Sequence, residues 1–155
     1  MAHEENFGTR DLTYSAWHRR MSTQRFVGIE NAQRLHMIDL DAALYIEYDD
    51  ETKEPLALVE TARESNRYKC ATVTRNLARK AGIPAFTLLY TPSNMPNPSY
   101  PSCMDIASFR VRRIWPEPND WKTISPKDWA EWLLKIRQVS ASKLDELLEA
   151  GLLEA

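Results

Sequence analysis

The chain has 155 residues, a length typical of one domain, and its 43% hydrophobic and 27% charged residues exclude a wholly disordered chain. The formal net charge of −2 gives no overall attraction for nucleic acid, and the absence of a long apolar run excludes a membrane-spanning helix. Two cysteines are too few for a disulfide framework and no secretory signal is recognised, so we expect a cytoplasmic protein.

The first predicted element in chain order is a short helix over residues 11–20, with Asp11 as its N-cap. Apolar and polar side chains then alternate over 37–48, which predicts a strand with one face in the core. A second strand is predicted over 55–62. The polar residues between the two strands, 49–54, join them as a hairpin.

A longer helix is predicted over residues 66–81, with Ser65 as its N-cap. Gly82 follows it and supplies the left-handed conformation that commonly ends a helix. The next segment, 85–90, is apolar and predicts a buried strand that pairs in parallel with the strand before the helix. The inner stripe of the helix is predicted to comprise Cys70, Val73 and Leu77.

The C-terminal part of the chain begins with four prolines in the segment 91–103, which predict a loop. A strand is predicted over 105–115. Ser125 then opens a helix over 126–138, and a short acidic helix is predicted over 142–150. The apolar side of the first of these helices is predicted to comprise Trp129, Trp132, Leu133 and Ile136, with both tryptophans as packing anchors.

These elements predict a mixed α/β domain with an antiparallel hairpin at its centre. We expect residues 1–125 to form the α/β core and residues 126–155 to form a C-terminal helical extension of the same domain. The apolar faces of the C-terminal helices are the expected surface for a homodimer or another protein partner.

The predicted hairpin places three carboxylates, those of Asp39, Asp41 and Glu60, on one face of the sheet, opposite the face that packs on helices. Two registers fit its connection. In one, Asp41 lies directly opposite Glu60, and in the other Glu60 is offset by two residues. Crowded carboxylates raise each other's pKa unless a cation compensates, and a hard divalent cation such as Mg²⁺ suits oxygen ligands. The alternative is a polar sheet face whose acids pair with arginines.

Two segments of this hairpin, IDLDAALYIEY (38–48) and PLALVETA (55–62), carry a resemblance to a known family. With the stretch around Tyr14, His18 and Arg19, and with the helix that ends in AGIPAFTLLY, they resemble small phage or bacterial PD-(D/E)XK nucleases. This is the restriction-endonuclease-like superfamily. The resemblance covers residues 11–115 and implies an αβββαβ core that hydrolyses DNA with Mg²⁺ or Mn²⁺.

The resemblance also implies roles for individual residues. Asp41 and Glu60 match the family's metal-binding carboxylates, and Asp39 is a second acid on the same strand. Glu30 matches a helical acid that some members carry upstream, the alternative being an ordinary solvent-exposed glutamate. Contacts to substrate phosphates are expected from His18, Arg19, Arg63, Lys69, Arg75 and Arg79.

The chain departs from the family pattern at Ala62, where the family has a lysine that orients the attacking water or stabilises the transition state. Three explanations remain open. The cation comes from Arg63, Arg67 or Lys69, the fold serves binding alone, or the alanine was introduced by engineering. Losing one charged group of this kind typically lowers a rate roughly 10²–10³-fold.

The first functional hypothesis is therefore a metal-dependent nuclease that hydrolyses DNA phosphodiester bonds. The alternative is a catalytically inactive protein of the same fold that binds nucleic acid or a protein partner. A third hypothesis, a structural module without a site, applies if Asp39 and Asp41 pair with arginines. A Lys or Arg side chain beside Glu60 favours the enzyme, and an apolar wall there favours the binding protein.

Overall fold

A computed structural model of the chain describes residues 13, 17, 22–35, 40–65 and 71–149. The chain divides into two compact units, Met1–Asp39 and Leu40–Ala155. In the first unit, the described residues include two helices of four residues each, α2 (Gln24–Val27) and α3 (Ile29–Ala32). The helix predicted over 11–20 lies outside the described residues except at positions 13 and 17, which are helical.

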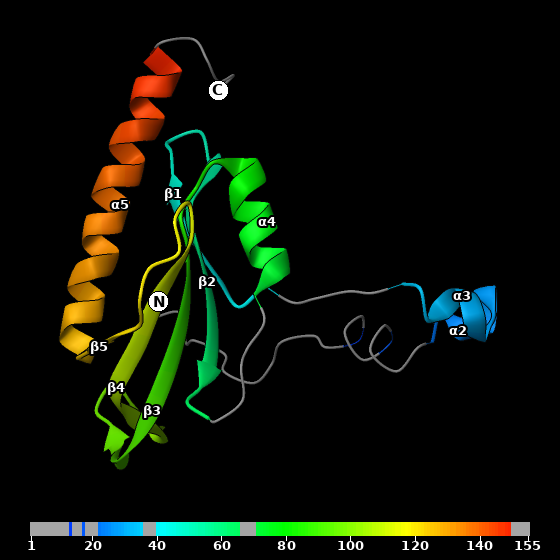
Figure 1. Cartoon of the computed structure of the whole chain (residues 1–155), viewed down its shortest axis with the longest axis horizontal. Coiled ribbons are helices and arrows are strands. Elements are labelled where there is room, and N and C mark those ends of the chain that lie inside the picture. Colours follow the sequence, from blue (N-terminus) through cyan, green and yellow to red (C-terminus); the bar gives the residue numbers. More distant parts are fainter. Residues whose placement is uncertain (1–12, 14–16, 18–21, 36–39, 66–70, 150–155) are drawn as a thin grey trace, which may run out of the picture. The chain divides into compact units, whose positions relative to one another are not determined.

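The second unit contains, within its described residues, a five-stranded mixed sheet with helices (Figure 1). The sheet order is β1-β2-β3-β4-β5, in which β2 and β3 are parallel and all other neighbours are antiparallel. The predicted mixed α/β class is confirmed, and so is the parallel pairing across a helix. The hairpin predicted at the centre lies instead at one edge of the sheet, where β1 is the edge strand. The strands are β1 (Ala42–Glu47), β2 (Lys53–Arg63), β3 (Ala85–Asn97), β4 (Tyr100–Trp115) and β5 (Lys122–Ile124).

The β1–β2 hairpin adopts the first of the two predicted registers. Ala42 pairs with Val59, so continuing the ladder by one residue sets Asp41 across from Glu60. The register with a two-residue offset is therefore wrong. β1 is shorter than the strand predicted over 37–48, and its residues before 40 lie outside the described part of the chain.

A β-bulge interrupts the hairpin between Leu44 and Tyr45 and leaves Leu56 without an opposite residue. β2 consequently begins at Lys53, inside the segment predicted as a connection. In the turn, the hydroxyl and the backbone N–H of Thr52 both donate to the Asp50 carboxylate and hold the pKa of that carboxyl below its usual value.

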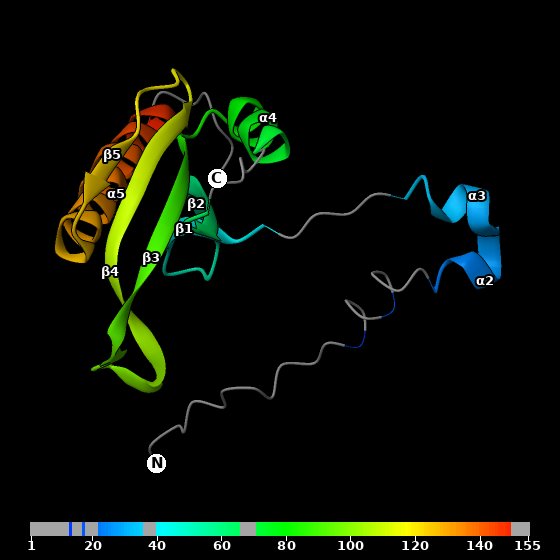
Figure 2. The same ribbon diagram turned by 60° about the horizontal axis from the view of Figure 1, so that its bottom comes forward.

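Helices cover both faces of the sheet: α5 (Pro126–Glu149) lies on one side and α4 (Thr72–Ala81) on the other (Figures 1 and 2). Two apolar clusters fill these layers, and they take alternate residues from the same strands, as the pleat requires. The face predicted to pack on helices, with Ala57 and Val59, does pack on α5, and the face of the predicted carboxylates is covered by a helix as well. The face that carries Glu60 is covered by α4.

Helix α4 packs through small side chains rather than through the predicted apolar stripe. Thr74 and Ala78 are buried, whereas Val73 and Leu77 are 45% and 41% exposed. The helix approaches the sheet closely because these buried residues are small, and Thr74 also supplies a hydrogen bond there. The predicted Ser65 cap is wrong, because the N-cap is Ala71 and makes no side-chain hydrogen bond. Cys70 lies outside the described residues.

Helix α5 is one continuous helix where two were predicted, because no glycine or proline interrupts it between Pro126 and Glu149. Ser125 caps it as expected, accepting a hydrogen bond from the backbone N–H of Asp128 at 3.0 Å. Its predicted apolar side is confirmed: Trp129 lies within the main core cluster, against which Trp132, Leu133 and Ile136 also pack.

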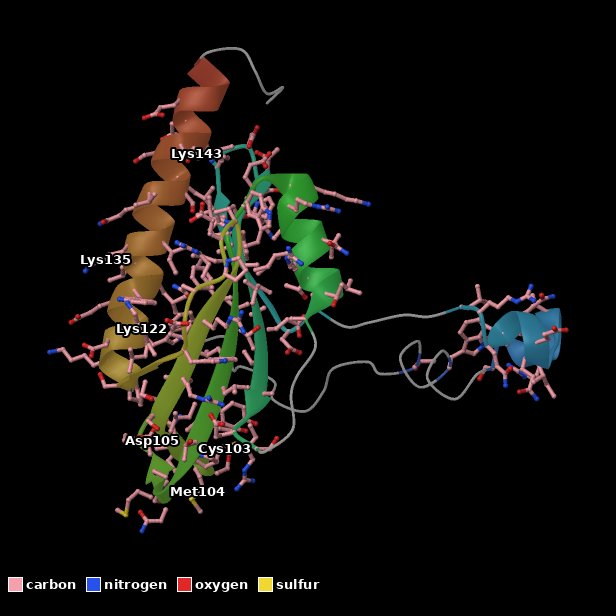
Figure 3. The ribbon with its side chains drawn as sticks, in the orientation of Figure 1. Cys103, Met104, Asp105, Lys122, Lys135 and Lys143 are labelled. Atoms are coloured by element: carbon pink, nitrogen blue, oxygen red, sulfur yellow. The ribbon has the colours of Figure 1, made fainter. Side chains whose placement is uncertain are left out.

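The segment 91–103, predicted as a loop, instead forms the end of a long β3–β4 hairpin. Only Pro98 and Ser99 separate the two strands. Pro92 and Pro96 are tolerated because the hydrogen-bonded pairing of β3 with β4 is irregular on both sides of each. At such positions the strand does not need the backbone N–H that proline lacks. Figure 3 shows Cys103, Met104 and Asp105 near the free end of this hairpin, and both Cys103 and Met104 are exposed.

Replacing Gly82 with alanine is expected to lower the free energy of unfolding by roughly 1–2 kcal/mol, the cost of a left-handed conformation for an ordinary residue. Gly82 ends α4 at φ 70°, as predicted, and a Cβ added there would meet nothing within 4 Å. The cost is therefore conformational, and Gly82→Asn should recover part of it. Urea unfolding of both variants measures the difference, and equal losses would contradict this explanation.

None of the helices in the described segments is both long and apolar enough to cross a membrane.

Candidate active site

Asp41 lies just before β1. The last residues of β2 extend past the first residue of β1, and Asp41 lies beside them. The backbone N–H of Thr61 donates to the Asp41 carboxylate at 2.8 Å, and the Thr61 hydroxyl lies 3.4 Å from the same oxygen. At this point β1 no longer pairs with β2. The Asp41 carboxylate therefore accepts a hydrogen bond that a backbone carbonyl accepts where strands are paired. This contact fixes the Asp41 carboxylate against Thr61, the residue that follows Glu60 on β2.

Glu60 is a buried carboxylate on β2, only 3% exposed. The hydroxyl of Thr74 on α4 donates a hydrogen bond to its Oε1 atom. A buried carboxylate is costly unless it is hydrogen-bonded or neutralised, so Thr74 helps to hold it in place. Sequence reasoning identified Glu60 but missed Thr74, because the predicted inner stripe of the helix was one residue out of phase.

Asp41 and Glu60 are the two predicted site residues that the hairpin register sets at opposite positions of neighbouring chain segments. Carboxylate oxygens on neighbouring strands are ligands that suit Mg²⁺, which usually takes one or two carboxylates together with water and phosphate oxygens. The third predicted acid, Asp39, lies outside the described residues. Among the residues that are described, no group of three or more His, Cys, Asp or Glu side chains is arranged to hold a metal.

Position 62 carries no cation in this site. Ala62 follows Glu60 by two residues on β2, so it shares the same face of the sheet, and it is half-buried. Of the replacement cations considered from the sequence, Arg63 is exposed at the end of β2. Arg67 and Lys69 lie outside the described residues.

The other predicted phosphate contacts fall into two groups. His18 and Arg19 lie outside the described residues. Arg75 and Arg79 are exposed on α4, Arg75 near its start and Arg79 in its last turn. Glu30 is an exposed residue of α3 whose carboxylate lies 3.7 Å from the Arg34 guanidinium, as in an ordinary helical ion pair.

A row of polar side chains runs across the sheet from Glu60, and the sequence reasoning did not predict it. Glu60 pairs with Thr87 on β3, and Thr87 pairs with Arg112 on β4. Thr87 is 3% exposed, an unusual position for a polar residue within the apolar first half of β3. Two signals in the sequence could have revealed the row: the lone threonine in AFTLLY and the alternation of Arg110 and Arg112 with apolar residues.

The neighbouring arginine of β4, Arg110, is already paired. Its guanidinium donates two hydrogen bonds to Glu64, at 2.7 and 3.1 Å, and stacks on the ring of Trp121 at 4.7 Å. This two-point geometry fixes Arg110 and neutralises its charge. Arg110 is therefore less suited to bind a substrate than Arg112.

No protein-family model, curated protein or solved structure matches this chain. Its function is therefore inferred from the residues and the geometry of the candidate site.

Proposed function

We propose that this protein is a metal-dependent nuclease that hydrolyses DNA phosphodiester bonds, with Asp41 and Glu60 as its metal-binding carboxylates. The observation that carries the proposal is the hairpin register, which sets Asp41 across from Glu60 beside the end of β1. The order of hairpin, helix α4 and parallel strand β3 supports the proposal in part, because the described residues have two strands before α4 where the αβββαβ core that the sequence resembles has three.

The residues around the two carboxylates have defined roles in this proposal. The Thr61 N–H orients the Asp41 carboxylate, and the Thr74 hydroxyl orients that of Glu60, as outer-shell donors do around metal ligands. Each contact restrains the carboxylate to which it donates. A divalent ion bound there would make water a better nucleophile and offset the negative charge that develops on the phosphate.

Metal binding and DNA cleavage together test the proposal. Calorimetric titration with Mn²⁺ and Mg²⁺ is expected to show binding by the unmodified protein and at least tenfold weaker binding by Asp41→Asn and Glu60→Gln. Cleavage of a DNA duplex should fall in the same two variants. Glutamine keeps an acceptor for the Thr74 hydroxyl, so the Glu60 variant should fold.

Glu54→Gln is the matched control, because Glu54 lies on the same strand at the end away from the site. It should keep both metal binding and cleavage. No metal binding by any chain up to millimolar concentration, or equal binding in all four chains, would contradict the proposed carboxylate site.

A catalytically inactive protein that binds nucleic acid is the second candidate function. It is favoured by Ala62, which leaves the position of the family's lysine without a charge, and by the cover that α4 gives Glu60. This alternative predicts that the protein binds a DNA duplex but leaves it intact at every Mg²⁺ and Mn²⁺ concentration. Fluorescence anisotropy and a cleavage assay on the same duplex separate the two functions.

A further inference from the structure

A cavity of about 110 Å³ lies between α4 and the sheet, beside Glu60 but not including it. One water molecule needs roughly 10–15 Å³ of such space, so the cavity has room for several waters or for one tetrahedral anion. The sheet supplies its floor through Thr87, Arg112 and Ile114. The other described lining residues are Ala71, Thr72 and Arg75 at the start of α4, and Trp121 before β5.

The cavity is adjacent to the candidate active site through the pairing of the strands. Thr87 pairs with Glu60 on one side and with Arg112 on the other. Neighbouring strands lie about 4.8 Å apart, so the cavity begins one strand beyond Glu60. A nucleic-acid strand at the carboxylates therefore lies within reach of the cavity.

The charge of the cavity is positive, since Arg75 and Arg112 line it and none of its described lining residues is acidic. The Nε atom of Arg112 is buried and has no hydrogen-bond partner among the described residues. Leaving a buried donor unpaired is costly, and a guanidinium group matches phosphate oxygens in a two-point contact. Arg112 thus differs from Arg110, which Glu64 neutralises.

Two further features of the cavity favour an anion. Thr87 adds a hydroxyl from the floor, and the cavity lies at the N-terminal end of α4, where the helix dipole attracts negative charge. The N-cap is Ala71, whose methyl side chain cannot accept a hydrogen bond from the first turn of the helix. The two arginines carry the inference, and the helix end only adds to it.

We infer that this cavity binds a backbone phosphate of the DNA strand that the protein cuts, with Arg112 and Arg75 as the phosphate-binding side chains. The inference rests on the proposed nuclease function and adds to it a second contact point for the substrate. The pocket positions the strand relative to Asp41 and Glu60, and its arginines take no part in the hydrolysis itself.

The experiment compares the unmodified protein with Arg112→Gln, Arg75→Gln and the control Arg137→Gln, which changes an exposed arginine of α5 on the other face of the sheet. All measurements are made in EDTA, so that binding is observed without cleavage. Thermal unfolding is followed in phosphate and in chloride at equal ionic strength. Binding of a fluorescent DNA duplex is followed by anisotropy at several salt concentrations.

Phosphate is expected to raise the melting temperature of the unmodified protein and of Arg137→Gln, and to raise it much less in the two pocket variants. Each pocket variant should bind the duplex roughly tenfold more weakly. The slope of log affinity against log salt concentration should also be less steep, by about one counterion released on binding. Arg75 is exposed, so Arg75→Gln should fold even if the substitution at Arg112 disturbs the sheet.

Two results would overturn the inference. If phosphate does not stabilise the unmodified protein and the pocket variants keep their affinity for the duplex, the cavity is not a phosphate site. If the pocket variants lose only the effect of free phosphate, the ligand is a small anion and not a DNA strand. Failure of the nuclease proposal would give a different result. The duplex would stay intact in the cleavage assay, while binding of phosphate and of the duplex in EDTA would still depend on Arg112 and Arg75.

Discussion

Replacing Ala62 with lysine is expected to raise the rate of metal-dependent DNA cleavage roughly 10²–10³-fold, the usual contribution of one charged group to a transition state. Ala62 and Glu60 share one face of β2, so the new ammonium group would lie on the side of the carboxylates. Position 62 is half-buried, and the long lysine stem lets the charged end reach toward solvent and substrate. Single-turnover cleavage of a DNA duplex in Mg²⁺ measures the gain.

Ala62→Met is the matched control for this gain, because methionine has similar length and no charge. It should fold and bind metal as the lysine variant does, but cleave no faster than the unmodified protein. If both variants cleave at the same rate, the charge at position 62 is not what limits the reaction. If Ala62→Lys cleaves the duplex and the unmodified protein and Ala62→Met do not, the protein has kept the site and lost one catalytic group.

The relative positions of Asp41 and Glu60 in the hairpin could be predicted from the sequence because they depend on local pattern. The alternation of apolar and polar residues determined which face of the hairpin carries Asp41 and Glu60, and a short connection left only two registers. The environment of Glu60 could not be predicted in the same way. Its burial depends on α4, and the distance between a helix and a sheet is set by tertiary packing.

Helix α4 illustrates how side-chain size can outweigh hydrophobicity. The sequence favours Val73 and Leu77 as the inner face, since they are the larger apolar residues. The structure buries Thr74 and Ala78 instead, because small side chains allow close approach and a threonine can satisfy the carboxylate below it. An apolar side chain at position 74 would leave Glu60 without this donor.

The long β3–β4 hairpin was not predicted, and the physical reason is a different one. Proline removes a backbone donor, so four prolines in 91–103 argue against a regular strand. The ladder avoids the loss through irregular pairing around Pro92 and Pro96, which no local pattern reveals. The short strand β5 was missed because three residues carry too little periodicity.

The core beneath α5 centres on Trp129, which is 7% exposed. Its ring meets Phe86 edge to face at 6.3 Å and lies 6.3 Å from the ring of Phe109. These rings come from α5, β3 and β4, so one side chain joins the helix to two central strands. Aromatic pairs of this kind add roughly 0.5–1.5 kcal/mol beyond the burial of their area.

Trp129→Ala is therefore expected to lower the free energy of unfolding by roughly 3–5 kcal/mol, as large core truncations do. Trp132→Ala is the control, because Trp132 lies one turn further along α5 and is only partly buried, with Lys122 at 5.9 Å from its ring. Its cost should stay within the roughly 0.5–3 kcal/mol of ordinary substitutions. Guanidinium unfolding followed by circular dichroism compares the two without relying on tryptophan fluorescence. Equal losses would mean that α5 is held by its whole apolar side, whereas the expected difference makes Trp129 the residue that fixes the helix on the sheet.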